Sequence, residues 1–442
     1  MDLETLVRRH GTDSLGLELY HEKSTETSFF CLNGSITSKE SREFEGFGIR
    51  VCDRDGRVGF SYCQSESQLA AAIRRAAGMV GHSPGCLGYS FPQAGKYPSS
   101  PSWLDSEARE IGCLQPSGAM GMFNDFISSC QEGGTIALEG GFSVESHEHS
   151  IANSNGLFAS SAGGSLSASM QTKFNDNSAY AMHSSQRLGD FAAGSIEEGR
   201  KSSLLAREIA DARALPSGKY DLLFELPALH SLLSEILLPS FDGDSILSKS
   251  SMLAGRAGER MFSESFTLLD DPADLRGFFA AFDGEGVPSS GKRLVENGAV
   301  SGFLLDSRAA CLLGKDACGG IGNCARNSFQ SMPSCGESNL VVSASGGAAD
   351  MAGEYIEIHS FHGTHTANTT TGDFSVISDL AFWCNPKSPA GGERVPVKNV
   401  MISGNAFRLF NAFSPVGGNQ GRFLNLISPR IMFEGVEIVG ST

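Results

Sequence analysis

Closely spaced cysteine pairs and long apolar runs are both missing from this sequence. It contains eleven cysteines, but no two have the Cys-x-x-Cys spacing, which argues against a zinc ribbon. We therefore expect reduced thiols in a reducing compartment. Ser, Gly or Pro interrupts every apolar run before it reaches the length of a membrane-spanning helix. The first residues, MDLETLVRRHGTD, are charged and lack the apolar core of a signal peptide.

Positive charge is also scarce. The 442 residues include 34 Lys and Arg against 50 Asp and Glu, which gives a net charge of −16. A surface that binds nucleic acid needs concentrated Lys and Arg, so the composition predicts no nucleic-acid partner. Together with the lack of a membrane span, it predicts a soluble cytoplasmic protein without membrane contact. Glycine, by contrast, is abundant at 53 residues, which favours strands and tight turns.

The chain length predicts two domains. Strands and helices alternate in the first part, with a hairpin turn at Asn33-Gly34 and an amphipathic helix in SESQLAAAIRRAAGMV. A charged helix near residues 196–214 marks a change in composition, and many short strands with turn signals follow it. We therefore predict an α+β fold. An N-terminal α/β domain (1–195) precedes a β-rich C-terminal domain (196–442) with a strongly bent or barrel-like antiparallel sheet.

The segment that begins at Leu226 combines an apolar run with a single carboxylate. The run predicts a buried helix that carries Glu235, ends near Pro239 and is followed by the acidic turn Asp242-Gly243-Asp244. The sequence shows no obvious partner for Glu235. Two interpretations follow, a hydrogen-bonded or partly exposed structural residue, or a catalytic base that works without a metal, and we favour the first.

Histidines gather in two places. His359, His362 and His365 are three residues apart in IHSFHGTHT, where the neighbouring residues predict a strand and a turn. Positions three apart on a strand point to opposite faces, so at least one ring is expected to point away from the others. A structural or substrate-contacting role is therefore favoured over a metal site. His147 and His149 would share one face of a strand, which is typical of a solvated surface.

Several longer stretches carry a family resemblance. FCLNGSITSKESREFEGFGIRVCDRDGRVGF lies near the N-terminus, and HGTHTANTTTGDFS and VKNVMISGNAFRLFNAF lie near the C-terminus. Their order, from about residue 15 onward, resembles that of the TldD/PmbA family, whose members were once called modulators of DNA gyrase. The resemblance implies an α/β N-terminal domain, a β-rich C-terminal domain and a cytosolic protein that works as a dimer.

The family has two branches. TldD-like members carry His-Glu-x-x-x-His before an acidic turn and a Cys near the C-terminus, which together hold a zinc ion with an open position for water. Aligned on Asp242-Gly243-Asp244, the two histidine positions are Ser234 and Pro239, and the glutamate is Glu235. The stretch 417–432 contains no Cys. The resemblance thus implies the PmbA/TldE-like branch, without catalytic residues or metal ligands on this chain.

The resemblance also implies a function. We expect a non-catalytic subunit of a TldD/TldE-type cytosolic zinc metalloprotease that processes or degrades unfolded peptides, with zinc in the TldD-like partner. His359, His362 and His365 are candidates for peptide contact, as is Arg326 in a glycine-rich loop. Two alternatives stay open. One is a metalloprotease with a relocated metal site on the histidine segment or on Cys318, Cys324 and Cys335. The other is a peptide-binding regulatory homodimer without protease activity.

Overall fold

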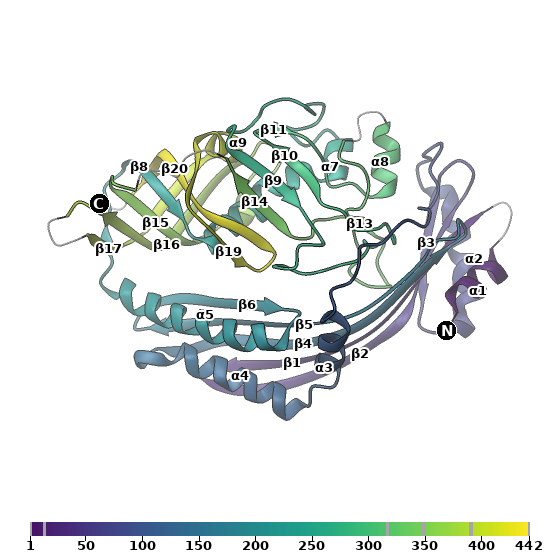
Figure 1. The fold of residues 1–442 in the computed structure, drawn as a ribbon, viewed down its shortest axis with the longest axis horizontal. Helices are drawn as coiled ribbons and strands as arrows, with labels where there is room; N and C mark the ends of the chain where they lie inside the picture. The colour runs from purple at the N-terminus through teal and green to yellow at the C-terminus, as the bar shows by residue number, and fades with distance from the viewer. Residues whose placement is uncertain (1, 12–14, 315–317, 346–350, 389–391, 441–442) are drawn as a thin grey trace.

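A computed structural model describes residues 2–11, 15–314, 318–345, 351–388 and 392–440. The first half is built on a six-stranded antiparallel sheet with the order β3-β2-β1-β4-β5-β6 (Figure 1). Its strands are β1 (Gly16–Leu32), β2 (Ser35–Cys52), β3 (Val58–Cys63), β4 (Ile136–Asn153), β5 (Phe158–Phe174) and β6 (Asn177–Ser185). The predicted hairpin is confirmed, because Asn33 and Gly34 both have positive φ and join β1 to β2.

Helices cover one face of this sheet. They are α1 (Leu3–His10), α2 (Leu69–Met79), α3 (Leu104–Gly112), α4 (Pro116–Cys130) and α5 (Leu188–Glu208). Alternate residues of the strands point to this face, so Phe29 and Phe142 pack against Phe123 of α4 and Phe191 of α5. The sequence did not predict α3, because its Pro-, Ser- and Gly-rich surroundings indicated a loop. The opposite face of the sheet points towards the second half of the chain.

The second half contains a twelve-stranded sheet that closes on itself. Five of its strands form a closed ring, β20-β8-β15-β16-β18, because β18 pairs with both β16 and β20. The strands are β7 (Arg213–Ala214), β8 (Gly218–Phe224), β9 (Phe266–Asp270), β10 (Lys292–Glu296), β11 (Ala299–Val300), β14 (Leu340–Ala344), β15 (Tyr355–His362), β16 (Asp373–Asn385), β17 (Glu393–Lys398), β18 (Val400–Asn405), β19 (Phe413–Phe423) and β20 (Leu426–Val439). The α+β class and the barrel-like sheet are thus confirmed. The sheet is mixed rather than purely antiparallel, since β8–β15, β14–β20 and β17–β7 are parallel.

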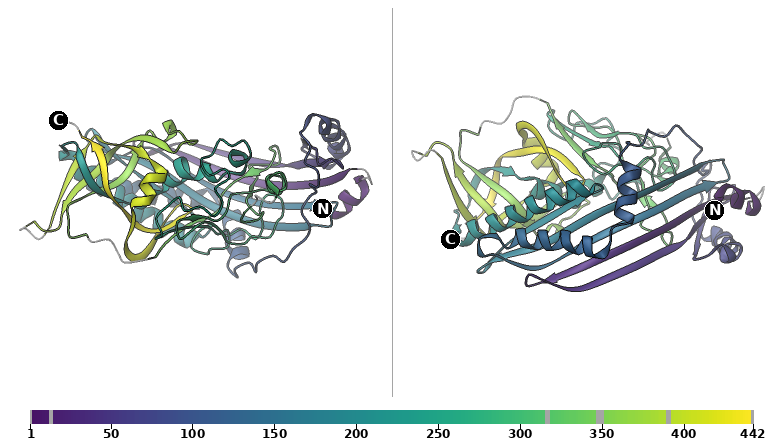
Figure 2. Two further views of the ribbon diagram at one scale, coloured as in Figure 1. Left: turned by 90° about the horizontal axis from the view of Figure 1, so that it is seen from above. Right: turned by 60° about the horizontal axis from the view of Figure 1, so that its bottom comes forward.

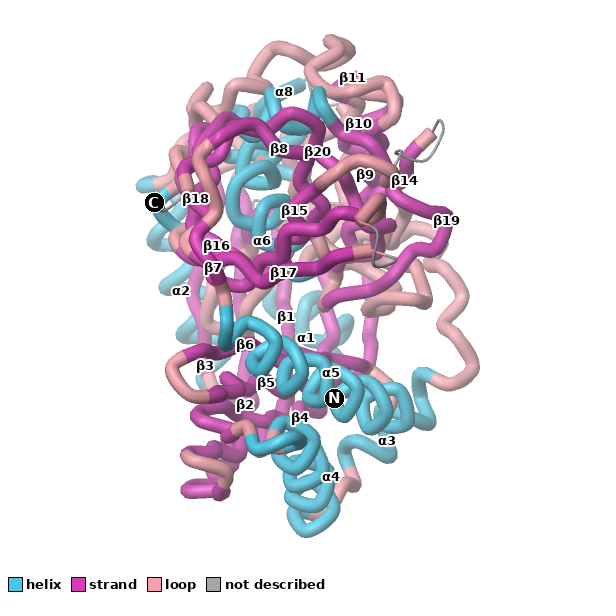
Figure 3. Tube along the Cα trace, turned by 90° about the vertical axis from the view of Figure 1, so that its left-hand side faces the viewer, coloured by secondary structure: helices cyan, strands magenta, loops and turns pink. Residues whose placement is uncertain are grey.

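The predicted apolar helix lies within this ring of strands (Figure 3). It begins as α6 (Leu226–Ser231), and its leucines pack with Phe224, Ile356 and Ile358 in the largest apolar core. Burial of such aliphatic side chains contributes about 1.5–3 kcal/mol each. Three further short helices, α7 (Gly243–Leu247), α8 (Ser307–Leu313) and α9 (Ala406–Leu409), surround the sheet.

The two halves pack against each other over a broad area, with the second half lying over the sheet of the first (Figure 2). Helix α5 contributes to both, because Phe191 packs in the core of the first half and Leu205 packs with Leu380 and Phe382. The predicted domain boundary after residue 195 falls within α5 and stays a prediction. None of the helices in the described ranges is long and apolar enough to cross a membrane.

Candidate functional site

The helix that carries Glu235 changes its hydrogen-bonding pattern along its length. After α6 it continues as a π-helical segment, η5 (Leu232–Leu237), and ends in a 3₁₀ turn, η6 (Leu238–Phe241). Pro239 lacks a backbone N–H and so cannot continue the α-helical ladder. In the π-helical segment, one side of the helix faces a cavity, while the leucines of the segment stay buried. Such π-helical segments are frequent at functional sites. Glu235 is exposed on that side.

Glu235 lines a cavity of about 360 Å³, here called the α6 cavity. Its walls come from α5, α6, η5, β6 and β15, so both halves of the chain form it. The polar and charged lining residues include Glu198, Lys201, His230, Glu235, His359 and His362. The apolar ones include Tyr180, Met182, Leu205, Phe361, Leu380 and Phe423. This mixture suits a ligand with both apolar and hydrogen-bonding groups.

Several polar groups of the α6 cavity already have partners within the protein. Glu235 accepts a hydrogen bond from the Thr364 hydroxyl at 2.5 Å, which agrees with the favoured interpretation of a hydrogen-bonded, partly exposed residue and supplies the partner that the sequence did not reveal. The residues that supply the bond are 129 positions apart, which no local pattern indicates. His230 bonds through Nε2 to the Asn425 amide oxygen at 2.9 Å. Burial lowers the pKa of His230, which favours a neutral ring at pH 7.

A carboxylate next to this cavity is strongly stabilised in its ionised form. Burial alone would raise the pKa of Glu357, but hydrogen bonds from His359 and Arg394 bring it down to about 2. Arg394 donates to Glu357 at 2.8 Å, and His359 bonds to the same carboxylate. The imidazole of His359 is therefore held by Glu357 and packs against the Phe382 ring.

The structure separates the four predicted peptide-contacting residues. His359 and His362 both line the α6 cavity from β15, where His359 is buried and His362 is exposed beside the Tyr180 ring. His365 lies in the turn η8 (Thr364–Thr366), is exposed and lines neither cavity described here. Arg326 lies in a different cavity. Their contact with a peptide stays a prediction.

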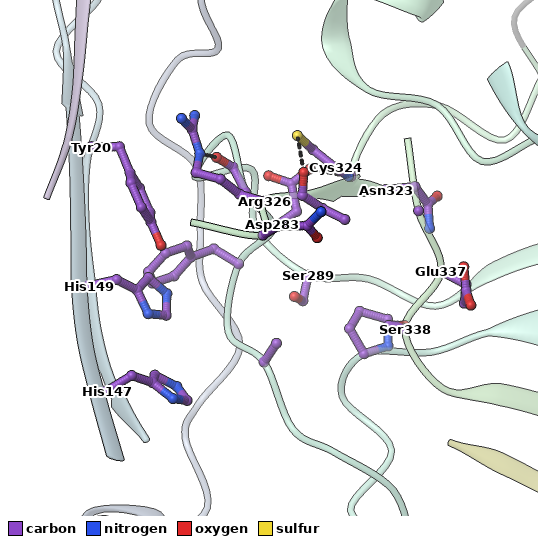
Figure 4. A pocket seen from close by; sticks show the side chains of 18 of the residues that line it. Tyr20, His147, His149, Asp283, Ser289, Asn323, Cys324, Arg326, Glu337 and Ser338 are labelled. Atoms are coloured by element: carbon purple, nitrogen blue, oxygen red, sulfur yellow. Dashed lines mark hydrogen bonds between the residues drawn. The ribbon is translucent and has the colours of Figure 1, made fainter. Parts of the chain in front are cut away.

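This second cavity, of about 330 Å³, lies between the sheet and the loops of the second half (Figure 4). We call it the β4 cavity. Tyr20 of β1 and His147 and His149 of β4 project from the sheet, and Asp283 and Arg326 face them from the loops. Burial lowers the pKa of His149 to about 4 and raises that of Asp283 to about 7. His147 and His149 thus share a strand face as predicted, but this face lines a cavity.

Arg326 holds a wall of the β4 cavity in place. Its Nε donates to the Gly284 carbonyl at 3.1 Å and its Nη2 to Glu18 at 2.9 Å. The guanidinium also lies over the Tyr20 ring, 4.5 Å from its centroid. These contacts join the loop to the sheet, so the side chain has a structural task whether or not it also touches a peptide.

Comparison with known protein families establishes the family to which this chain belongs. Residues 17–80 match the family model for PmbA/TldA metallopeptidase domain 1. Residues 217–440, just over half of the chain, match the model for the PmbA/TldA metallopeptidase C-terminal domain. The chain belongs to the TldD/PmbA family. The resemblance drawn from the sequence is thereby confirmed, and the family is metalloprotease-like.

Relatives of this TldD/PmbA chain match it over most of its length. An uncharacterized protein from Methanocaldococcus jannaschii is 28% identical over 440 residues, which are 98% of this chain and 99% of that protein. A protein named metalloprotease from Methanothermobacter thermautotrophicus is 25% identical, over 90% of this chain and 86% of its own. The crystal structure of TldE from Thermococcus kodakarensis superimposes with a TM-score of 0.84 at 24% identity, covering 99% and 100% of the two chains. A putative modulator of a DNA gyrase from Thermotoga maritima gives 0.81 at 21%, covering 99% and 98%.

The zinc site that the resemblance implies for TldD-like members does not fit the residues of this TldD/PmbA chain. Ser234 is half-buried on η5, and Pro239 lies in η6 and has no side-chain donor atom. In the described ranges, no three His, Cys, Asp or Glu side chains are grouped so that they could hold a metal ion. Cys324 and Cys335 face each other across the short strands β12 (Cys324–Ala325) and β13 (Ser334–Cys335), and all eleven cysteines are free.

Four residues that line the α6 cavity were not predicted from the sequence. Glu198 and Lys201 lie within the charged part of α5, and such a run of charged residues is typical of a solvated helix face. Tyr180 and Met182 alternate on β6, a pattern of large exposed side chains on an edge strand that could have indicated a binding surface.

Proposed function

We propose that this chain is a non-catalytic, TldE-like subunit that binds unfolded peptides and works with a zinc-bearing TldD-like partner. The observation that carries the proposal is the donor set on η5 and η6. Glu235 is present at the cavity, but Ser234 and Pro239 stand where the catalytic branch has its two histidines. Serine is a poor zinc ligand and proline offers none, while the cavity that would receive a peptide is retained.

The shape of the α6 cavity supports peptide binding. In the described part of the chain, β6 pairs with β5 and with no strand on its other side. An extended peptide could therefore add backbone hydrogen bonds to β6, a mode that tolerates many sequences. Tyr180 and Met182 on this strand, with Phe423 and Leu380 opposite, would contact its apolar side chains. Glu198, Glu235 and Lys201 supply charged groups of both signs.

Peptide binding is tested by truncating one aromatic side chain. We expect Tyr180→Ala to weaken the binding of a fluorescein-labelled unfolded peptide about tenfold, since an exposed aromatic side chain in a binding surface is worth 1 kcal/mol or more. Tyr62→Ala is the matched control, because Tyr62 on β3 is 47% exposed against 49% for Tyr180 and does not line the α6 cavity. Equal affinities of the two variants in fluorescence anisotropy would contradict the assignment of the site.

The subunit role is tested by mixing experiments. We expect the purified chain to contain no stoichiometric zinc by mass spectrometry and to cleave no peptide alone. Cleavage should begin when a family member with His-Glu-x-x-x-His from the same organism is added. Zinc-dependent cleavage by the pure chain would instead favour a relocated metal site. Peptide binding without any complex with that family member would favour a regulatory role independent of a protease.

A further inference from the structure

Two cysteines from different halves of the chain meet at one end of the molecule. The sulfur atoms of Cys86 and Cys311 lie 2.8 Å apart, although 225 positions separate the two residues in the sequence. Cys86 lies in the loop that follows α2, and Cys311 lies on α8. A disulfide bond is about 2 Å long, so the two side chains need to move by less than about 1 Å to form one.

The backbone around Cys86 holds its side chain in place. The Cys86 N–H donates to the Asp55 carbonyl at 3.0 Å, and the Cys86 carbonyl accepts from the Tyr89 N–H at 2.9 Å. A Cβ at Gly56 would lie 1.9 Å from the Cys86 carbonyl oxygen, so this loop packs directly on the turn between β2 and β3. The Cys86 side chain is buried there in a small apolar cluster, and Cys311 packs against the same cluster.

A second contact fixes α8 beside this loop. Arg308, one turn before Cys311 on α8, donates from Nη2 to the Pro84 carbonyl at 2.6 Å. Its Nη1 is buried and has no hydrogen-bond partner in the described ranges. Helix α8 therefore brings to Cys86 both a sulfur atom and a positive charge, which stabilises a thiolate as it forms.

The two thiols differ in their access to solvent. Cys86 is 4% exposed, whereas Cys311 is half-buried. Burial raises the pKa of Cys86 to about 12, an effect that the charge of Arg308 opposes. The Cys86 thiol is therefore protonated at pH 7 and shielded from an external oxidant. Cys311 is the sulfur that a small molecule reaches first, and Cys86 is placed to attack it afterwards.

We propose that Cys86 and Cys311 form a reversible disulfide that joins the two halves of the chain when the surrounding thiol pool becomes oxidised. In a reducing compartment the pair stays reduced, as the sequence leads us to expect. Helix α8 and β3 lie at one end of the molecule, and α5 and β6 lie towards the other (Figure 1), so the bond forms away from the α6 cavity. This inference goes beyond the proposed function and does not depend on it.

The reaction requires a small-molecule disulfide as its oxidant. The Cys311 thiolate attacks one sulfur of this disulfide, breaks its S–S bond and releases one small thiolate. Cys86 then attacks the Cys311 sulfur of the mixed disulfide, and the second small thiolate leaves. The protons of the two protein thiols pass to the two released thiolates. Two protein thiols are thus oxidised to one disulfide, and one small disulfide is reduced to two thiols.

Thiol counting in glutathione buffers tests the bond in the full chain. On incubation with oxidised glutathione, we expect two of the eleven thiols to be lost without attached glutathione, as measured by mass spectrometry after alkylation. A peptide that links Cys86 to Cys311 should appear in the digest, and excess reduced glutathione should restore both thiols. No loss of thiols, a link from Cys86 to Cys52 instead, or a bond that reduced glutathione does not reopen would overturn the proposal.

Matched serine variants test the consequence for stability. A link across 225 positions restricts the unfolded chain, so oxidation should raise the unfolding midpoint of the parent by about 3–5 °C in thermal denaturation. Cys311→Ser should show no such rise. Cys113→Ser removes an exposed thiol outside this contact and should respond to oxidation like the parent. An equal rise in Cys311→Ser and Cys113→Ser would overturn the assignment of the bond to this pair.

Discussion

At the scale of single residues, the charge of Glu357 stabilises the wall of the α6 cavity, because Glu357 binds His359, which lines that cavity. Its folded-state pKa of about 2 lies below the ordinary value of 4.5, so its stabilising effect is complete above about pH 4.5 and is lost as the pH falls towards 2. We expect Glu357→Gln to lower the free energy of unfolding by about 2 kcal/mol at pH 7. Urea denaturation at pH 7, 4 and 3 should show the difference from the parent shrinking with decreasing pH.

The matched control for this carboxylate is Glu110→Gln. Glu110 is exposed on α3, and its replacement should change the unfolding midpoint little at any of these pH values. An equal effect of the two substitutions, or a difference for Glu357→Gln that grows in acid, would contradict the assignment of the charge network around His359.

At the scale of elements, local signals predicted much of the fold. The turn at Asn33-Gly34, the helix α2 and the strands of the second half follow from residue patterns. A barrel-like sheet was predicted, but the strands that close it were not, because β18 pairs with β20 only when segments far apart in the chain meet. The same limit applies to the site: Glu235 was found from its helix, whereas Thr364 and the β6 wall depend on tertiary packing. The π turn before Pro239 is also invisible to a helical period.

Strand β2 holds a loop of the second half by close backbone approach. A Cβ at Gly48 would lie 2.8 Å from the Phe329 carbonyl oxygen and 3.4 Å from the Arg326 guanidinium. We expect Gly48→Ala to lower the free energy of unfolding by about 2 kcal/mol through this overpacking. Gly78→Ala, where α2 has open space, should instead be stabilising by about 0.5–1 kcal/mol. Thermal denaturation of both variants distinguishes steric contact from a general effect of adding a methyl group.

At the scale of the whole molecule, a buried ion network joins the two halves. Arg50 of β2 binds Glu18 of β1 through two hydrogen bonds of 2.8 and 2.6 Å, and Glu285 of the second half at 2.8 Å. Arg326 adds a second cation to Glu18, and the Ser307 hydroxyl and amide both donate to Glu285. All these groups are shielded from water, so each charge depends on its partners.

Removing the central cation should therefore uncouple the halves. We expect Arg50→Met to leave the carboxylates of Glu18 and Glu285 buried without their shared partner and to cost about 3–5 kcal/mol. Differential scanning calorimetry should show the single transition of the parent separating into two, because the cores of the two halves are distinct. Arg57→Met removes a partly exposed cation that binds Asp53 and Asp55 and should cost less than about 1 kcal/mol. A single transition of Arg50→Met, with an unfolding temperature lowered no more than that of Arg57→Met, would show that the network does not couple the halves. The packing of α5 against both halves would then be the better explanation of their association.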